Sequence, residues 1–111
     1  MKDKIKNGVL IIYLEGNMIG TYASGPLIDL ITKNIESGNK KVLFNLSEMK
    51  FIDSTGLGML LITLFKTRKA GGEMALCNVP GKMHELLQIT RLDDVFIQHP
   101  DEETALAFLM A

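Results

Sequence analysis

Strand-type and helix-type segments alternate along this chain, and the alternation limits the folds open to it. Short apolar stretches predict buried strands at 8–16, 41–46, 73–79 and 94–100. Each is followed by a stretch with helical spacing of apolar residues, at 21–38, 54–69, 82–89 and 101–111. Strands that alternate with helices favour a parallel sheet with right-handed crossovers. We therefore expect an α/β fold: a mixed, mostly parallel sheet of four to five strands with packed amphipathic helices.

The fifth strand is expected near the N-terminus, at residues 4–6. Asn7 and Gly8 separate it from the next strand, and Asn-Gly is a preferred two-residue turn of β-hairpins. We expect this short segment to pair with the following strand as an edge strand.

Composition and charge exclude several classes of function. The chain has 111 residues, a length typical of one domain, and is 47% hydrophobic and 23% charged, as globular proteins are. Its 12 basic and 13 acidic residues leave a net charge of −1, which argues against electrostatic capture of nucleic acid. The single cysteine, Cys77, excludes an intrachain disulfide and a thiolate zinc site. No segment has the pattern of a signal peptide or a membrane span, so we expect a cytoplasmic protein without membrane insertion.

The helix expected at 54–69 has more apolar residues than one buried face needs. Their spacing predicts that one set packs on the sheet: Leu57, Leu60, Leu61, Leu64 and Phe65. A second line, on the opposite face, comprises Thr55, Met59, Ile62 and Lys66. Either a neighbouring helix covers Met59 and Ile62, or the two form a protein-binding surface, since exposed apolar patches often mark interfaces. In the helix at 82–89, the residues expected to point inward are Met83, Leu86, Leu87 and Ile89.

Three short polar residues, Asp53, Ser54 and Thr55, stand at the start of the helix at 54–69. Either Asp53 or Ser54 can cap the helix by accepting hydrogen bonds from its first backbone N–H groups. A cap needs only one of these side chains, so the presence of three indicates a second role for the remaining two. Gly56 and Gly58 each destabilise a helix by roughly 1 kcal/mol relative to alanine, and we interpret them as giving a partner close access to the hydroxyls.

The stretch FNLSEMKFIDSTGLGMLL, residues 44–61, closely resembles the phosphorylation motif of the STAS domain in the small single-domain anti-sigma-factor antagonists of bacteria. The resemblance covers nearly the whole chain, including Gly71-Gly72 before the third strand and LLQITRLDDVF at 86–96. It implies one STAS domain over residues 1–111. It also implies a cytoplasmic regulator of transcription that works through protein–protein interaction and is not an enzyme.

In that family an antagonist binds an anti-sigma factor that is also a serine kinase, and phosphorylation of the antagonist breaks the complex. A serine phosphatase restores it. Carried over to this sequence, the phosphoacceptor is Ser54. The other partner-binding candidates are Asp53, Thr55, Gly56, Gly58, Met59 and Ile62, together with Asn17, Met18 and Ile19.

The stretch GNMI at 16–19 departs from the family pattern. Related antagonists often carry G-E-[LI]-D there, whereas this chain has Asn17 and Ile19 in place of the two acids. The change favours a diverged or different kinase partner. An alternative function is a phosphorylation-independent STAS interaction module of a signalling or transport complex.

Catalysis, cofactors and metals find little support. A serine hydrolase would pair Ser54 with His84 or His99, but Ile52 occupies the first glycine position of the G-x-S-x-G elbow. Gly56-Leu57-Gly58 lacks the further glycine and the lysine of a phosphate loop. We therefore expect no catalytic residues, no cofactor and no metal. The expected oligomeric state is a monomer or a weak dimer formed through the Met59–Ile62 face.

Overall fold

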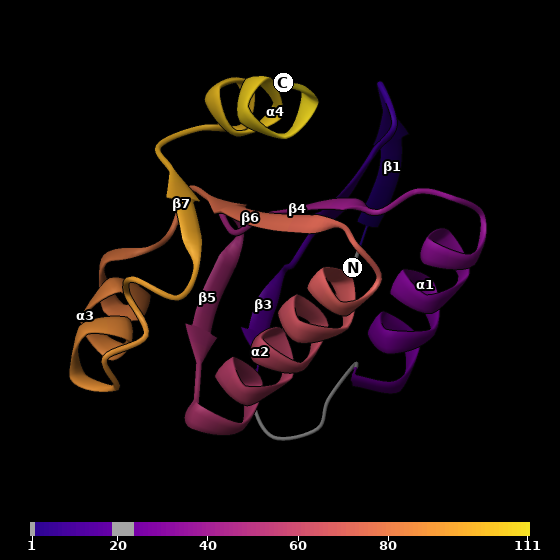
Figure 1. The fold of residues 1–111 in the computed structure, drawn as a ribbon. Coiled ribbons are helices and arrows are strands. Elements are labelled where there is room, and N and C mark those ends of the chain that lie inside the picture. Colours follow the sequence, from indigo (N-terminus) through magenta and orange to yellow (C-terminus); the bar gives the residue numbers. More distant parts are fainter. Residues whose placement is uncertain (1, 19–23) are drawn as a thin grey trace.

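A five-stranded sheet with helices on both faces forms the body of the protein (Figure 1). The computed structural model describes residues 2–18 and 24–111. The strand order is β1-β2-β4-β6-β7, in which β1 is antiparallel to β2 and the other neighbours are parallel. These strands are β1 (Lys2–Lys6), β2 (Val9–Tyr13), β4 (Lys41–Asn45), β6 (Glu73–Cys77) and β7 (Ile97–His99). The helices are α1 (Ser24–Glu36), α2 (Ser54–Lys69), α3 (Gly81–Ile89) and α4 (Glu102–Met110). The predicted α/β fold and mostly parallel sheet are confirmed.

The N-terminal hairpin follows from the turn between β1 and β2. Asn7 has φ 53° and Gly8 has φ 79°, both in the left-handed region that a tight two-residue hairpin turn requires. Lys6 therefore stands opposite Val9 in an antiparallel ladder. The predicted edge strand is confirmed and is longer than expected, since it begins at Lys2.

A second, two-stranded sheet is an element that the sequence pattern missed. Its strands, β3 (Gly16–Met18) and β5 (Met49–Ile52), run parallel and are only a few residues long. The apolar stretch at 8–16 is not one strand, because β2 ends at Tyr13 and the chain then turns toward β5. β5 leads directly into α2 and so holds the start of that helix in place.

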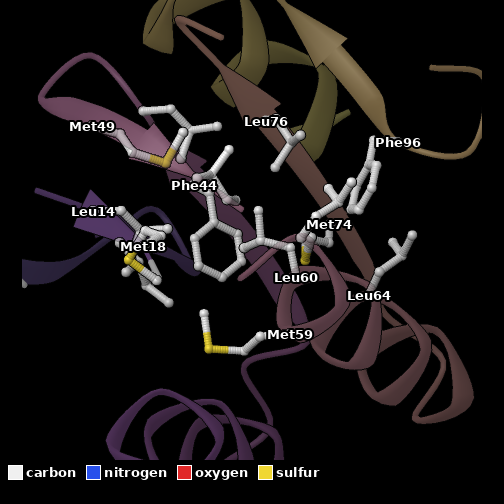
Figure 2. Packing of buried hydrophobic residues seen from close by; sticks show 14 of the residues in the cluster. Leu14, Met18, Phe44, Met49, Met59, Leu60, Leu64, Met74, Leu76 and Phe96 are labelled. Carbon is white, nitrogen blue, oxygen red and sulfur yellow. The ribbon is translucent and has the colours of Figure 1, made fainter. Parts of the chain in front are cut away.

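The two faces of the large sheet carry two separate apolar cores. On one face, residues of α1, α2, α3 and the small sheet pack together on β2, β4 and β6. Phe44 of β4 is fully buried in this core, and Figure 2 shows it close to Met59 and Leu60 of α2. On the other face lies α4 (Figure 1), the only helix on that side in the described part of the chain, and it packs on the sheet through Ala105, Leu106 and Leu109.

Two residues expected in the core are on the surface instead. Phe65 of α2 is 58% exposed and Ile89, the last residue of α3, is 79% exposed. The buried side of α2 is instead completed by Thr63 and Thr67, whose hydroxyls each donate to a backbone carbonyl of the same helix at 2.7 Å. Because both hydroxyls are hydrogen-bonded within the helix, the two threonines can face the core. The buried face of α2 is therefore turned relative to the expected one, and Phe65 points outward.

Candidate functional site

Asp53 connects β5 to α2 and caps the helix. Its Oδ1 accepts a hydrogen bond from the backbone N–H of Gly56 at 2.8 Å, and its carbonyl accepts one from Leu57 at 2.9 Å. Its own N–H donates to the carbonyl of Met18 in β3 at 3.2 Å, which ties the helix start to the small sheet. A cap of this kind stabilises a helix by about 1 kcal/mol. Of the two expected candidates for the cap, Asp53 is therefore the one used.

Ser54 and Thr55 form the exposed first turn of α2. The first backbone N–H groups of a helix carry roughly half a positive charge in total, so added negative charge is favourable there. α2 itself contains no acidic residue in this turn, and the nearest carboxylate is that of the cap Asp53, which accepts the N–H of Gly56. The position can therefore carry a phosphate on a hydroxyl without unfolding the helix.

The two glycines of the motif, which look alike in the sequence, differ in their surroundings. A Cβ on Gly56 would lie 2.4 Å from the carbonyl oxygen of Met18, so the contact between α2 and β3 requires glycine. A Cβ on Gly58 would meet nothing within 4 Å. Packing therefore accounts for Gly56, and the predicted role of close access for a partner stays a prediction for Gly58 alone.

The apolar surface expected at Met59 and Ile62 is present only in part. Ile62 is 54% exposed, but Met59 is 4% exposed and belongs to the core shared with α1, so for Met59 the alternative of cover by a neighbouring helix holds and its side chain is not part of an exposed binding surface. The exposed side of α2 instead carries Ser54, Gly58, Ile62 and Phe65, spaced by three or four residues. Phe65 was missed as a surface residue, although its position three residues after Ile62 places the two on one side of the helix.

The described part of the stretch GNMI, residues 16–18, pairs with β5 beside the motif, and its residues differ in what they expose. Asn17 is exposed and pairs with Phe51 of β5, which is another exposed hydrophobic residue that sequence reasoning missed. Met18 is 3% exposed, so its side chain packs in the core beneath α2 and is not accessible to a partner. Ile19 lies outside the described residues.

The histidines are not gathered around Ser54. His84 is exposed on α3, and the ring of His99 contacts that of Phe108 of α4 in a tilted arrangement, with 5.2 Å between the ring centroids. α4 lies on the face of the sheet opposite α2 (Figure 1). Within residues 2–18 and 24–111, no group of three histidine, cysteine or acidic side chains could hold a metal ion, and no helix is long and apolar enough to cross a membrane.

A partly buried polar cluster helps to anchor α4 on that opposite face. The Tyr13 hydroxyl donates to Glu102 Oε1 at 2.6 Å, and the Asn45 amide donates to the same oxygen at 3.1 Å. Burial, reinforced by the bond to Glu102, raises the pKa of Tyr13 to about 12. These hydrogen bonds join α4 to the sheet, and the sheet separates the cluster from Ser54.

Known proteins resemble this chain over most of its length. A family profile described as STAS domain matches residues 1–105. The anti-sigma F factor antagonist of Paenibacillus polymyxa is 28% identical over 107 residues, which cover 92% of this chain and 87% of that protein. An anti-sigma factor antagonist from Mycobacterium paratuberculosis has the same fold, with a TM-score of 0.82 at 22% identity, covering 99% of this chain and 92% of that one. The Bacillus cell fate determinant SpoIIAA, in its phosphorylated form, aligns with a TM-score of 0.74 at 21% identity and covers 96% of each chain.

Proposed function

Because the chain belongs to the STAS domain family, we propose that residues 1–111 act as one bacterial anti-sigma-factor antagonist domain that is switched by phosphorylation of Ser54. When unmodified, the protein binds an anti-sigma factor that is also a serine kinase. Phosphorylation releases it, and a serine phosphatase restores binding. The observation that carries the proposal is an exposed serine at the first position of α2, beside a cap that another residue supplies.

The charge of the phosphate acts mainly on the complex. Phosphorylation adds about −1.5 to −2 charge, which the start of a helix tolerates. In the complex the same charge would be buried against the partner, close to the carboxylate of Asp53. A penalty of about 4 kcal/mol would lower the affinity roughly a thousandfold. The domain can therefore switch partners without a large change of its own shape.

The roles of the candidate residues follow from their exposure. Ser54 and Thr55 offer hydroxyls, while Ile62, Gly58 and Asn17 provide the neighbouring contact surface. The motif residues beneath the surface maintain its shape: Asp53, Gly56, Met18 and Met59. The phosphorylated form of SpoIIAA has the same fold, which supports the proposal that this architecture accepts a phosphate.

The test compares Ser54→Ala and Ser54→Asp in binding to the anti-sigma factors of the source organism, measured by calorimetry. We expect Ser54→Ala to bind as the wild type does and to resist release by the kinase, and Ser54→Asp to bind at least roughly tenfold more weakly. Thr55→Ala serves as the control and should remain switchable. Equal affinity of the alanine and aspartate variants would contradict the switch.

Mass spectrometry of the protein from growing and stressed cells tests the same proposal in its natural setting. Phosphate on Ser54 with an occupancy that changes between conditions supports the switch. An unmodified Ser54 under all conditions, combined with stable binding to a partner, would favour the phosphorylation-independent interaction module.

A further inference from the structure

The exposed side of α2 carries a ridge that extends well beyond the proposed phosphorylation site. It consists of Ser54, Gly58, Ile62 and Phe65, and we call it the α2 ridge. Ile62 is 54% exposed and Phe65 is 58% exposed, although both are large apolar side chains. No charged residue occurs on α2 from Ser54 to Phe65. Two such side chains on consecutive turns form an apolar surface that is typical of an interface.

Gly58 makes a hollow in the middle of the ridge. It lies one turn after Ser54 and one turn before Ile62, and the space where its Cβ would stand is open. Glycine inside a helix is unfavourable relative to alanine, and here neither backbone conformation nor packing requires it. The missing side chain leaves room beside Ile62 for a side chain from another molecule.

Two basic residues lie beyond the C-terminal end of the α2 ridge. Lys66 and Lys69 follow Phe65, and α2 has no acidic residue anywhere along its length. Arg68 is already paired with Glu73 at 3.0 Å. The two lysines border a groove of about 360 Å³ between α1 and α2, in which Glu36 is the one acid among the lining residues. The exposed side of α2 is therefore uncharged along the α2 ridge and positively charged beyond it, at Lys66 and Lys69.

We infer that the α2 ridge is the docking site for one amphipathic helix of the anti-sigma factor. A bulky apolar side chain of that helix sits over Gly58, against Ile62 and Phe65, as a knob sits in a hole between packed helices. Acidic side chains at one end of the same helix lie over Lys66 and Lys69, where their charge is complemented. This inference rests on the proposed function and adds the kind of partner segment that the site accepts.

Filling the hollow tests the inference. The probe is the anti-sigma factor that binds the wild-type chain, identified by titrating each one that the source genome encodes. Gly58→Ala should raise the midpoint of thermal unfolding by about 4 °C, because alanine favours the helix and meets no obstacle. Gly58→Leu should remain folded and lower the affinity for the probe roughly tenfold or more. Gly81→Leu is the matched control, since Gly81 starts α3 and also has open space at its Cβ position.

Two further variants test the apolar and the basic parts of the ridge. Phe65→Ala should weaken binding roughly tenfold, whereas Ile89→Ala, at an exposed isoleucine on α3, should leave it unchanged. Lys66→Glu combined with Lys69→Glu should slow association and make it less sensitive to salt. Wild-type affinity in a folded Gly58→Leu variant would overturn the inference.

The outcomes separate this inference from the switch. If Ser54→Asp binds as tightly as the wild type while Gly58→Leu does not bind, the phosphorylation switch fails and the docking site stands. If Gly58→Leu binds as tightly as the wild type while Ser54→Asp does not bind, the switch stands and the docking site fails. If the wild type binds no anti-sigma factor, both fail. If Phe65→Ala instead abolishes a wild-type dimer seen by sedimentation and does not affect the probe, the ridge is occupied by a second copy and the inference is wrong.

Discussion

Single atoms decide what each residue of the motif can do. The carbonyl oxygen of Met18 lies 2.4 Å from the place of a Cβ on Gly56, so one methyl group there would force β3 and α2 apart. The same methyl group at Gly58 would enter open space. Packing thus requires glycine at Gly56, whereas it places no such requirement on Gly58.

Gly56→Ala should therefore destabilise the protein by about 1–3 kcal/mol, the usual cost of overpacking. Chemical denaturation of the purified variant measures this change. Gly58→Ala is the control and should be at least as stable as the wild type. A Gly56→Ala variant with wild-type stability would mean that the contact between Gly56 and Met18 relaxes without cost.

Cys77 shows how burial controls the chemistry of a single side chain. It is fully buried in the core beneath α4. Burial, together with the nearby charges of Glu102 and Asp101, raises the pKa of the Cys77 thiol to about 12. We expect a thiol reagent to leave the folded protein unmodified at a mildly alkaline pH and to label it once urea unfolds it. Rapid labelling of the native protein would contradict the buried, protonated thiol.

At the scale of elements, one carboxylate of α4, that of Glu102, adds hydrogen bonds to the apolar contacts that dock the helix on the sheet. Burial by itself would raise the pKa of Glu102, but hydrogen bonds from Tyr13 and Asn45 and the charges of Lys4 and Lys6 outweigh it and hold this pKa below its usual 4.5. A carboxylate whose pKa is lower in the folded state stabilises the fold above its unfolded pKa. That stabilisation is lost as the pH falls through the folded value.

Glu102→Gln should therefore lower the free energy of unfolding at neutral pH and flatten its dependence on pH in the acid range. Denaturation at a series of pH values from neutral to below the usual glutamate pKa measures both effects. Glu103→Gln, at an exposed neighbour in the same turn, is the control and should follow the wild type. An unchanged acid dependence in Glu102→Gln would show that the carboxylate does not anchor α4.

At the scale of the whole molecule, the two apolar cores share one sheet and should unfold together. β2, β4 and β6 contribute alternate side chains to the core beneath α2 and to the core beneath α4. Loss of either core would expose the strands that support the other.

Leu60→Ala and Leu109→Ala test this coupling, because each removes a buried leucine from a different core. Each should lower the free energy of unfolding by about 2–5 kcal/mol and leave a single transition. Far- and near-ultraviolet circular dichroism should report the same midpoint for each variant. A separate, earlier transition in Leu109→Ala would mean that α4 unfolds alone.

The main features of the fold follow from interactions between near neighbours in the chain. Apolar periodicity predicted four strands of the large sheet and the four helices of the described residues, the bounds of α2 agree with the predicted 54–69, and Asn7-Gly8 predicted the hairpin that adds the fifth strand. The polar residues before α2 indicated a cap, and the motif around Ser54 indicated the family. These features depend on backbone preferences and spacing over a few residues, which a sequence displays directly.

Only the tertiary structure decided which side of α2 meets solvent. Thr63 and Thr67, whose hydroxyls are bonded within the helix, face the core together with Met59, and Phe65 is exposed. The pairing of β3 with β5 decided that Gly56 is required while Gly58 is not. Each of these outcomes depends on atoms that are distant in the chain and become neighbours only on folding, so no local pattern contains them.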